Sequence, residues 1–195
     1  MTDRPYHHGR LRTVLLAEAE RTLREEGIEA LSLRDLARQA GVSHAAPRRH
    51  FADRQALLDA LAEAGFVRLG EKIRAAAADA AGDDYEARLR ATAAAYVRFA
   101  IEDAALVDVM FAAKRAGQPD ALPETAVPVF AAVGDLITQG QRAGKLPPGD
   151  PDQLRLLLIA TLQGIATLVT SGRAQAGQAG LLVADAVTLF VRAYD

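Results

Sequence analysis

The sequence contains no cysteine, and this absence removes several kinds of protein from consideration. Without thiols there is no disulfide framework, no thiol nucleophile and no thiolate metal site. Long hydrophobic runs are also missing, because the densest run, at 156–160, is far shorter than the roughly 18 residues of a membrane span. The first 12 residues are polar and contain three arginines, which is not the pattern of a secretory signal. We therefore expect a soluble protein of the cytoplasm with no membrane partner.

Motifs of catalysis are missing as well. The chain has no Gly-rich phosphate loop and no His-Glu metal motif, whereas a helical enzyme would need a nucleophile, a base or a metal site. The pair His7–His8 has no cysteine or clustered acids beside it, so a zinc site there is not favoured. We expect no catalytic residue, no metal and no cofactor.

What the chain does contain is a series of helix signals. Half of its residues are apolar and a quarter are charged, which is enough for a sizeable core. Every strong hydrophobic period is helical; Leu11, Leu15 and Ala19, for example, fall on one face of a first helix. Because no strand pattern is present, we expect an all-α fold of about nine helices.

Local signals set the expected helix boundaries. Ser32 caps a second helix, with an acid placed to reciprocate, and Gly41 supplies the left-handed residue that ends it. Ser43 is expected to cap a third helix that ends at Phe51; Pro47 lies near its start, where a proline costs less than in a helix interior. The remaining helices are expected at about 53–81, 83–102, 104–116, 125–143, 150–171 and 181–194.

Residues 32–51 are therefore interpreted as two short helices joined by a tight glycine turn, the second carrying Arg48, Arg49 and His50. This is a helix-turn-helix, the unit that lays its second helix in the major groove of DNA. The charge distribution agrees with this interpretation. Segments 1–12 and 32–54 carry eight arginines against three acids, a net charge of +5, which leaves −7 for the rest of a chain whose total is −2. A basic head on an acidic body suits a phosphate backbone.

The same residues resemble the tetracycline-repressor-like (TetR) family of bacterial transcription regulators. The resemblance is best over about 10–60 and rests on the spacing of Ser32–Ala37, Ala40–Ser43 and Arg49–Phe51. It implies a three-helix DNA-binding head in residues 1–56, with the motif at about 32–51. It also implies a larger helical domain in residues 57–195 that binds an effector and dimerises.

Three positions depart from the family pattern. The family usually has an aliphatic residue, a tyrosine and a lysine where this chain has Pro47, Arg48 and Arg54. Arg48 can replace the phosphate contact of the tyrosine with a fully charged one. DNA binding is therefore still expected, while the operator sequence is left open.

The resemblance and the side-chain chemistry together predict the DNA contacts. Phosphate contacts position a protein on DNA, and base contacts specify the sequence. The residues expected mainly at phosphates are Arg10, Ser32, Arg48, His50 and Arg54. The expected base-reading residues are His44, Ala45, Ala46 and Arg49, because arginine can bind guanine bidentately and alanine can meet a thymine methyl group. Ser43, the expected cap, is predicted as a further DNA-binding residue.

The last two helices are expected to form a dimer interface. They are apolar nearly all round, so they must be buried on several sides, and a second copy of the chain is the expected partner. The predicted interface residues are Leu154, Leu158, Leu162, Leu182, Leu189 and Phe190. A dimer carries two DNA-binding heads, which we call the reading heads, and their two-fold symmetry implies a palindromic operator.

The middle helices are expected to hold a small apolar or amphipathic effector. The predicted lining residues are Tyr96, Phe99, Met110, Phe111, Phe130, Val133, Ile137, Gln163 and Ile165, with Thr92 and Gln141 as further polar contacts. The same residues at helical spacing also suit an ordinary core. The family resemblance implies that effector binding shifts the population towards a conformation whose reading heads no longer match the half-sites.

The resulting hypothesis is a ligand-responsive bacterial transcription regulator, expected to act as a repressor, with activation as the open alternative. Two hypotheses from other classes stay open beside it. One is a helical enzyme, for which turnover of a substrate would speak. The other is a dimeric helical scaffold without a DNA role, and salt-dependent DNA binding separates it from a regulator.

Overall fold

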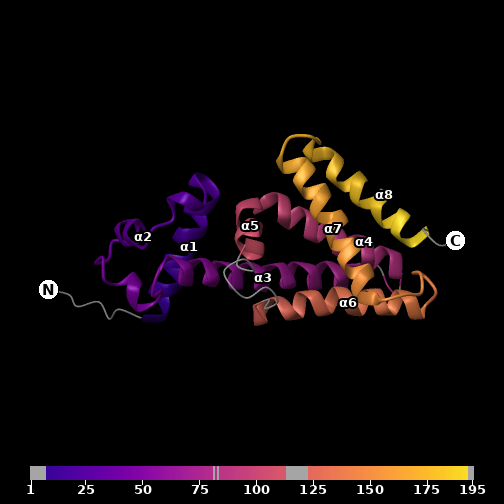
Figure 1. Cartoon of the computed structure of the whole chain (residues 1–195), viewed down its shortest axis with the longest axis horizontal. Coiled ribbons are helices and arrows are strands. Elements are labelled where there is room, and N and C mark those ends of the chain that lie inside the picture. The colour runs from indigo at the N-terminus through magenta and orange to yellow at the C-terminus, as the bar shows by residue number, and fades with distance from the viewer. Residues whose placement is uncertain (1–7, 81, 83, 113–122, 193–195) are drawn as a thin grey trace. The chain divides into compact units, whose positions relative to one another are not determined.

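The computed structural model describes the backbone of residues 8–80, 82, 84–112 and 123–192, and the side chains from residue 11 onward. Within these residues the chain forms helices and turns, with no strand (Figure 1), so the all-α prediction is confirmed. The ends of two predicted helices, at 113–116 and 193–194, lie outside the described residues. So do His7 and the side chains of His8 and Arg10.

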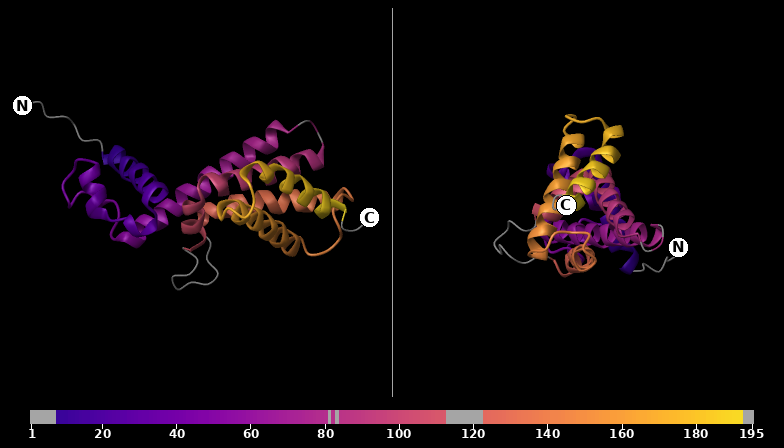
Figure 2. Two further views of the ribbon diagram at one scale, coloured as in Figure 1. Left: turned by 90° about the horizontal axis from the view of Figure 1, so that it is seen from above. Right: turned by 90° about the vertical axis from the view of Figure 1, so that its right-hand side faces the viewer.

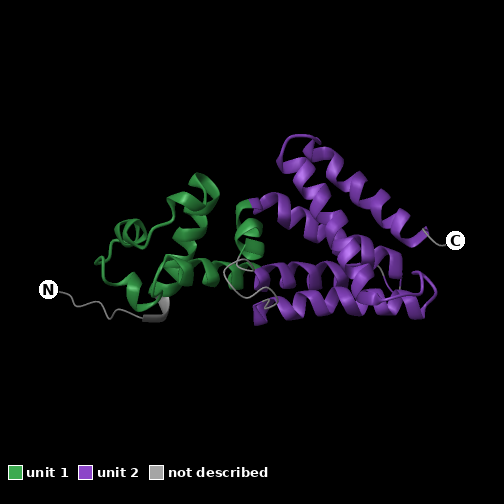
Figure 3. Cartoon of the chain, viewed as in Figure 1, with its two compact units in different colours: residues 1–65, 105–121 green, residues 66–104, 122–195 purple. Residues whose placement is uncertain are grey.

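The chain divides into two compact units (Figure 3). Unit 1 comprises residues 1–65 and 105–121, and unit 2 comprises residues 66–104 and 122–195. The described helices of unit 1 are α1 (His8–Glu26), α2 (Leu33–Gln39), the first part of α3 (Arg54–Asp79) and most of α5 (Ala104–Ala112). Unit 2 contains the rest of α3 together with α4 (Tyr85–Glu102), α6 (Val127–Arg142), α7 (Pro151–Thr170) and α8 (Ala179–Arg192). The predicted boundary at residue 56 divides the chain by function and stays a prediction.

The core of unit 1 is built from helical apolar stripes. Leu15, Ala19 and Leu23 of α1 are buried, and so are Leu36 and Ala37 of α2. In α1 a spacing of four residues places the three side chains on one face of the helix. The two helices pack against each other, which fixes α2 on the surface of α1.

Both ends of α2 form as the sequence predicts. The Ser32 hydroxyl oxygen accepts a hydrogen bond from the Asp35 N–H at 3.0 Å, and the hydroxyl donates to the Asp35 carboxylate at 2.6 Å. At the other end Gly41 has φ 65°, and the Val42 N–H donates to the Ala37 carbonyl at 2.9 Å. This ending requires a left-handed residue, which glycine supplies without steric cost.

The segment predicted as a third helix differs from the expectation. Residues 43–51 form turns followed by η2, a single 3₁₀ turn at Pro47–Arg49. Backbone N–H groups donate three residues back, from Ala46 to Ser43 at 2.9 Å and from Arg49 to Ala46 at 3.2 Å. Pro47 explains the difference, because it lacks the N–H that an α-helix would direct to the Ser43 carbonyl and its ring crowds that carbonyl. The described residues therefore contain eight α-helices, close to the predicted count of about nine.

Unit 2 is a bundle in which α4 packs against α7 and α8, and α7 also packs against α6 and α8. In the views of Figure 2 the orange α7 and the yellow α8 lie side by side. Asp150 caps α7 by accepting from the Asp152 N–H at 2.9 Å, ahead of the proline that opens the helix, as predicted.

By length and composition α7 is apolar enough to cross a membrane, whereas the sequence analysis expects no segment of that kind. One such helix is weak evidence for a membrane span, and α7 packs against three other helices of unit 2. We therefore describe it as a helix of the bundle.

Candidate nucleic-acid interface

The segment 43–51 is held in place by two buried side chains. Pro47 is buried, and Phe51 belongs to the core of unit 1. The Arg12 guanidinium of α1 lies 5.4 Å from the centroid of the Phe51 ring, an arrangement that adds a cation–π contact. These anchors leave the other side chains of the segment at the surface.

The side chains predicted to contact DNA lie mostly on that surface. Ser43, His44, Ala45, Arg48 and Arg49 are exposed, while Ala46 and His50 are half-buried. In the described part of the chain, neither Arg48 nor Arg49 has a hydrogen-bonded or ion-paired partner. No acid lies between Ser43 and Ala52. The segment is therefore a locally positive surface with two free guanidinium groups, which suits phosphate and base-edge acceptors.

Arg54 has internal partners that the sequence does not reveal. Its Nε donates to the Leu31 carbonyl at 3.1 Å and its Nη2 to the Ile28 carbonyl at 2.5 Å. These bonds tie the start of α3 to η1 (Ile28–Ala30), the turn that leads into α2. Arg54 thus positions the motif, and its guanidinium keeps further N–H donors for the phosphate contact that stays predicted. Ser32, also predicted at a phosphate, is engaged in the cap of α2.

The one acid on α2 stays charged and compensates one arginine. The pKa of Asp35 is lowered from its ordinary value, first by the hydrogen bond from Ser32 and then by the one from Arg38. Arg38 Nη2 lies 3.1 Å from the carboxylate. Arg38 is therefore neutralised locally, whereas Arg48 and Arg49 are not.

A second surface of interest lies on α7 and α8. The large apolar side chains exposed there, which we call the exposed leucines, are Leu156, Leu157, Leu168, Leu181 and Leu189. Among the predicted dimer residues, Leu189 is 71% exposed, and Leu154, Leu182 and Phe190 are half-buried. Leu158 and Leu162 are only 2% and 4% exposed, so they belong to the interior of the chain and are not available to a partner. Of the six predicted interface residues, Leu189 alone is one of the exposed leucines.

The residues predicted to line an effector pocket are mostly packed as core. The Tyr96 hydroxyl donates to Gln163 Oε1 at 2.5 Å, and burial raises the pKa of Tyr96 to about 12. The Phe130 ring lies 6.3 Å from that of Phe66, centroid to centroid. Of the other predicted residues, Phe99, Val133, Ile137 and Ile165 are buried in unit 2, and Met110 and Phe111 belong to unit 1. Gln141 holds the loop after α6, through the carbonyls of Pro147 and Gly149. Contact between the predicted pocket residues and a ligand stays a prediction.

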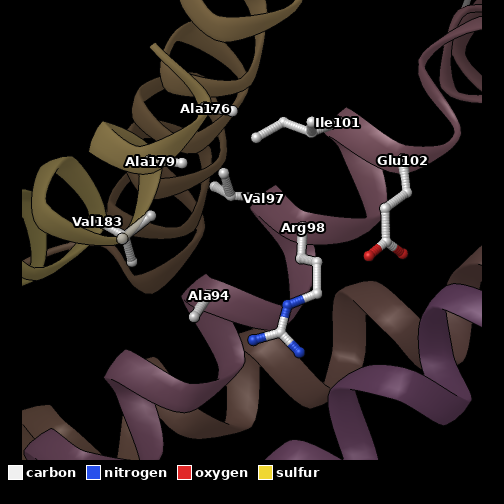
Figure 4. A pocket seen from close by; sticks show the side chains of 9 residues that line it. Ala94, Val97, Arg98, Ile101, Glu102, Ala176, Ala179 and Val183 are labelled. Carbon is white, nitrogen blue, oxygen red and sulfur yellow. The ribbon is translucent and has the colours of Figure 1, made fainter. Parts of the chain in front are cut away.

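Unit 2 carries an open groove of about 280 Å³ between α4 and the segment of η5 (Ala176–Gln178) and α8. In Figure 4, Arg98 and Glu102 extend from α4, and Ala176, Ala179 and Val183 lie across from them. The Glu102 carboxylate is paired with Lys72 Nζ at 3.2 Å. Apart from Arg98 and Glu102, the residues that line this groove are apolar.

A further groove of about 270 Å³ lies where α3, α4 and α6 meet in unit 2. Its polar lining residues are Arg74, Arg88, Thr92 and Gln139. Of the polar and apolar contacts that the sequence predicts for an effector, Thr92 alone lines either of these two grooves. Across the described residues, no cluster of three or more His, Asp or Glu side chains is placed to hold a metal ion.

Comparison with known proteins decides the family. The sequence model for bacterial regulatory proteins of the tetR family matches residues 15–61, and the model for the tetracyclin repressor-like C-terminal domain matches residues 89–193. The chain belongs to the TetR family of bacterial regulatory proteins. The first match contains the whole of segment 32–51, where the sequence predicts the helix-turn-helix. The resemblance inferred from the sequence is confirmed.

Solved structures of similar proteins agree with this assignment. A protein with unknown function from Rhodococcus sp. RHA1 is 44% identical, with 98% of each chain covered and a TM-score of 0.88. A TetR-family transcriptional regulator from Pectobacterium atrosepticum is 25% identical, with 98% of this chain and 97% of that one covered and a TM-score of 0.71. The transcriptional regulator FadR from Bacillus subtilis, in complex with stearoyl-CoA, shares the fold at 16% identity, with 94% of this chain and 99% of that one covered and a TM-score of 0.75. No curated protein matches the chain.

Proposed function

We propose that this TetR-family protein is a transcriptional repressor that binds a palindromic operator as a dimer and is released by a small-molecule effector. One observation carries the DNA-binding part of the proposal. Arg48 and Arg49 are exposed and free of internal partners in the described part of the chain, on the segment that matches the family's helix-turn-helix. Arginines with no structural role on a surface without acids are available for a polyanion.

The two arginines are assigned different tasks. Arg48, with Arg10, His50 and the free donors of Arg54, contacts phosphates and sets the register on the duplex. Arg49 and His44 reach base edges, and a bidentate arginine–guanine pair contributes about 1–3 kcal/mol of discrimination against a wrong base. Ala45 and Ala46 complete the base-reading group, and Ser43 is a further proposed DNA contact.

The exposed leucines of α7 and α8 are the proposed dimer surface. Three of them, Leu156, Leu181 and Leu189, are each more than half exposed. Exposed apolar side chains contribute little burial free energy to a monomer, and a cluster of them marks an interaction surface. A two-fold dimer would pair the same surface on both copies and present two reading heads to half-sites about one helical turn of DNA apart.

The effector is proposed to bind in unit 2 and to favour a dimer conformation with a different spacing of the reading heads. The shared fold with FadR, whose structure holds stearoyl-CoA, supports a ligand-binding role for this unit. A regulator of this kind works in the cytoplasm, where the DNA is, and acts by binding rather than by catalysis.

Selection of bound DNA from a random pool tests the function directly. We expect enrichment of an inverted repeat, with affinity that falls steeply as salt rises. The double variant R48A/R49A should lose binding while its thermal unfolding is unchanged. The matched control R142A/R192A removes the same charge from exposed positions of α6 and α8 and should keep operator affinity. Equal affinity of the two double variants would favour a scaffold without a DNA role, and turnover of a substrate would favour an enzyme.

A further inference from the structure

We propose that the groove formed by α3, α4 and α6 in unit 2 binds the carboxylate of a small amphipathic acid, recognised by Arg88 and Thr92. The inference rests on the proposed function, because it names the chemical class of the effector. The groove is built from residues that lie within one compact unit.

Two buried polar atoms on this groove have no partner. Thr92 is only 5% exposed, and its Oγ1 makes no hydrogen bond within the described part of the protein. Arg88 Nε is likewise buried and without a partner, while Arg88 Nη2 donates to Gln139 Oε1 at 3.3 Å. Leaving a buried donor unsatisfied is costly, and native structures do so rarely. Both donors belong to residues that line one groove, and we infer that an acceptor from outside the chain completes the site.

The charge of the groove identifies that acceptor as an anion. Its lining contains two arginines, Arg74 and Arg88, and no acid. Neither guanidinium is ion-paired with any carboxylate in the residues that the structure describes. Gln139, through its side-chain oxygen, orients the Arg88 guanidinium without neutralising it. An unneutralised, partly buried guanidinium binds anions more strongly than a neutral donor does.

The apolar part of the groove favours an organic acid over an inorganic anion. The remaining lining side chains include Ile73, Ala77, Ala132 and Leu136, which offer no hydrogen bonds. A volume of about 270 Å³ is at the lower end of small-molecule sites, so the ligand is a carboxylate with a short apolar body. Guanidinium pairs with the planar carboxylate, and the Thr92 hydroxyl donates to one of its oxygens.

Calorimetric titration of the full chain at constant ionic strength tests the assignment. The probes are sodium hexanoate, benzoate and phenylacetate, with hexanamide, benzamide and phenylacetamide as neutral matches and inorganic phosphate as a bare anion. We expect at least one of the acids to bind and its amide not to. R88Q and T92V should each weaken acid binding about tenfold or more. The control R98Q removes an arginine of the same helix that lines the other groove, and it should bind like the wild type.

The T92V variant separates recognition from a merely structural role. Removing an unpartnered buried hydroxyl should leave the melting temperature unchanged or raise it, while acid affinity falls. Failure of all three acids to bind at millimolar concentration, undiminished binding by R88Q and T92V, or phosphate binding as strong as that of the acids would overturn the proposal. Operator binding is measured separately. Intact operator binding without acid binding defeats this inference alone, whereas acid binding without operator binding defeats the proposed function.

Discussion

Replacing Leu189 tests whether the exposed leucines form the dimer interface. Leu189 is 71% exposed in the single chain, and full burial of a leucine side chain contributes about 2 kcal/mol. A partner that covers Leu189 therefore gains about 1.4 kcal/mol per copy, and two-fold symmetry doubles this to about 3 kcal/mol. L189A should raise the dimer dissociation constant about 100-fold. L189E should raise it further, because it would also bury two like charges near the two-fold axis or leave them unpaired.

The assay is sedimentation velocity over a series of protein concentrations. Val127 of α6 is 57% exposed but lies on neither α7 nor α8, so V127E is the matched control. We expect L189E to be monomeric where the wild type and V127E are dimeric, and to bind the operator more weakly because a monomer reads one half-site. An L189E protein that dimerises like the wild type would refute the reasoning and place the interface on another surface.

Three further predictions concern stability. S32A removes the cap of α2 and should lower the free energy of unfolding by about 1 kcal/mol in thermal melts, with S32T close to the wild type. The pKa of Asp35 is lowered in the folded state, so the stabilisation by its charge is present above the unfolded pKa of about 4 and is lost as pH falls through the folded value. D35N should therefore show a flatter dependence of urea unfolding on pH at the acidic end, and an unchanged profile would contradict this account. G140A should cost about 1–3 kcal/mol because its Cβ would overlap the buried Tyr85 side chain. G134A, on the same helix with its nearest atom at 3.8 Å, should not destabilise; equal unfolding midpoints for the two variants would show that the Tyr85 ring yields freely.

The helix ends were accessible to sequence reasoning because a cap acts over very few residues. Ser32 and Gly41 bound α2, and Asp150 begins α7, where the sequence places them. In each case the interacting groups lie within about five positions of each other. The identity of the residues therefore determines the contact almost independently of the rest of the fold.

The conformation of segment 43–51 was harder to predict from the sequence, because two local preferences compete there. Ser43 favours a helix start, whereas Pro47 removes one α-helical hydrogen bond and crowds a carbonyl. The lost hydrogen bond alone is a small cost near a helix start, but the crowding by the proline ring adds to it, and the segment forms a 3₁₀ turn. Arg54 was beyond local reasoning altogether, since its partners Leu31 and Ile28 are 23 and 26 residues away in sequence.

The surfaces of unit 2 depend on packing that periodicity alone does not resolve. Leu158 and Leu189 look alike in an apolar helix, but the first is in the interior and the second is exposed. Aromatic residues such as Phe99 have the same spacing whether they line a cavity or fill a core. The unpartnered hydroxyl of Thr92 becomes visible only when its neighbours are known.

In segment 43–51 the residues that anchor the backbone are different from those that are exposed at the surface. Pro47 and Phe51 are buried and anchor the backbone, whereas positions 44, 45, 48 and 49 contribute no packing to the interior. Exchanges at such surface positions typically change the free energy of unfolding by no more than about 0.5 kcal/mol. Operator preference can thus change, by evolution or by design, with little cost in folding stability. A library confined to the base-reading positions 44, 45 and 49 is a practical route to regulators that bind new operators.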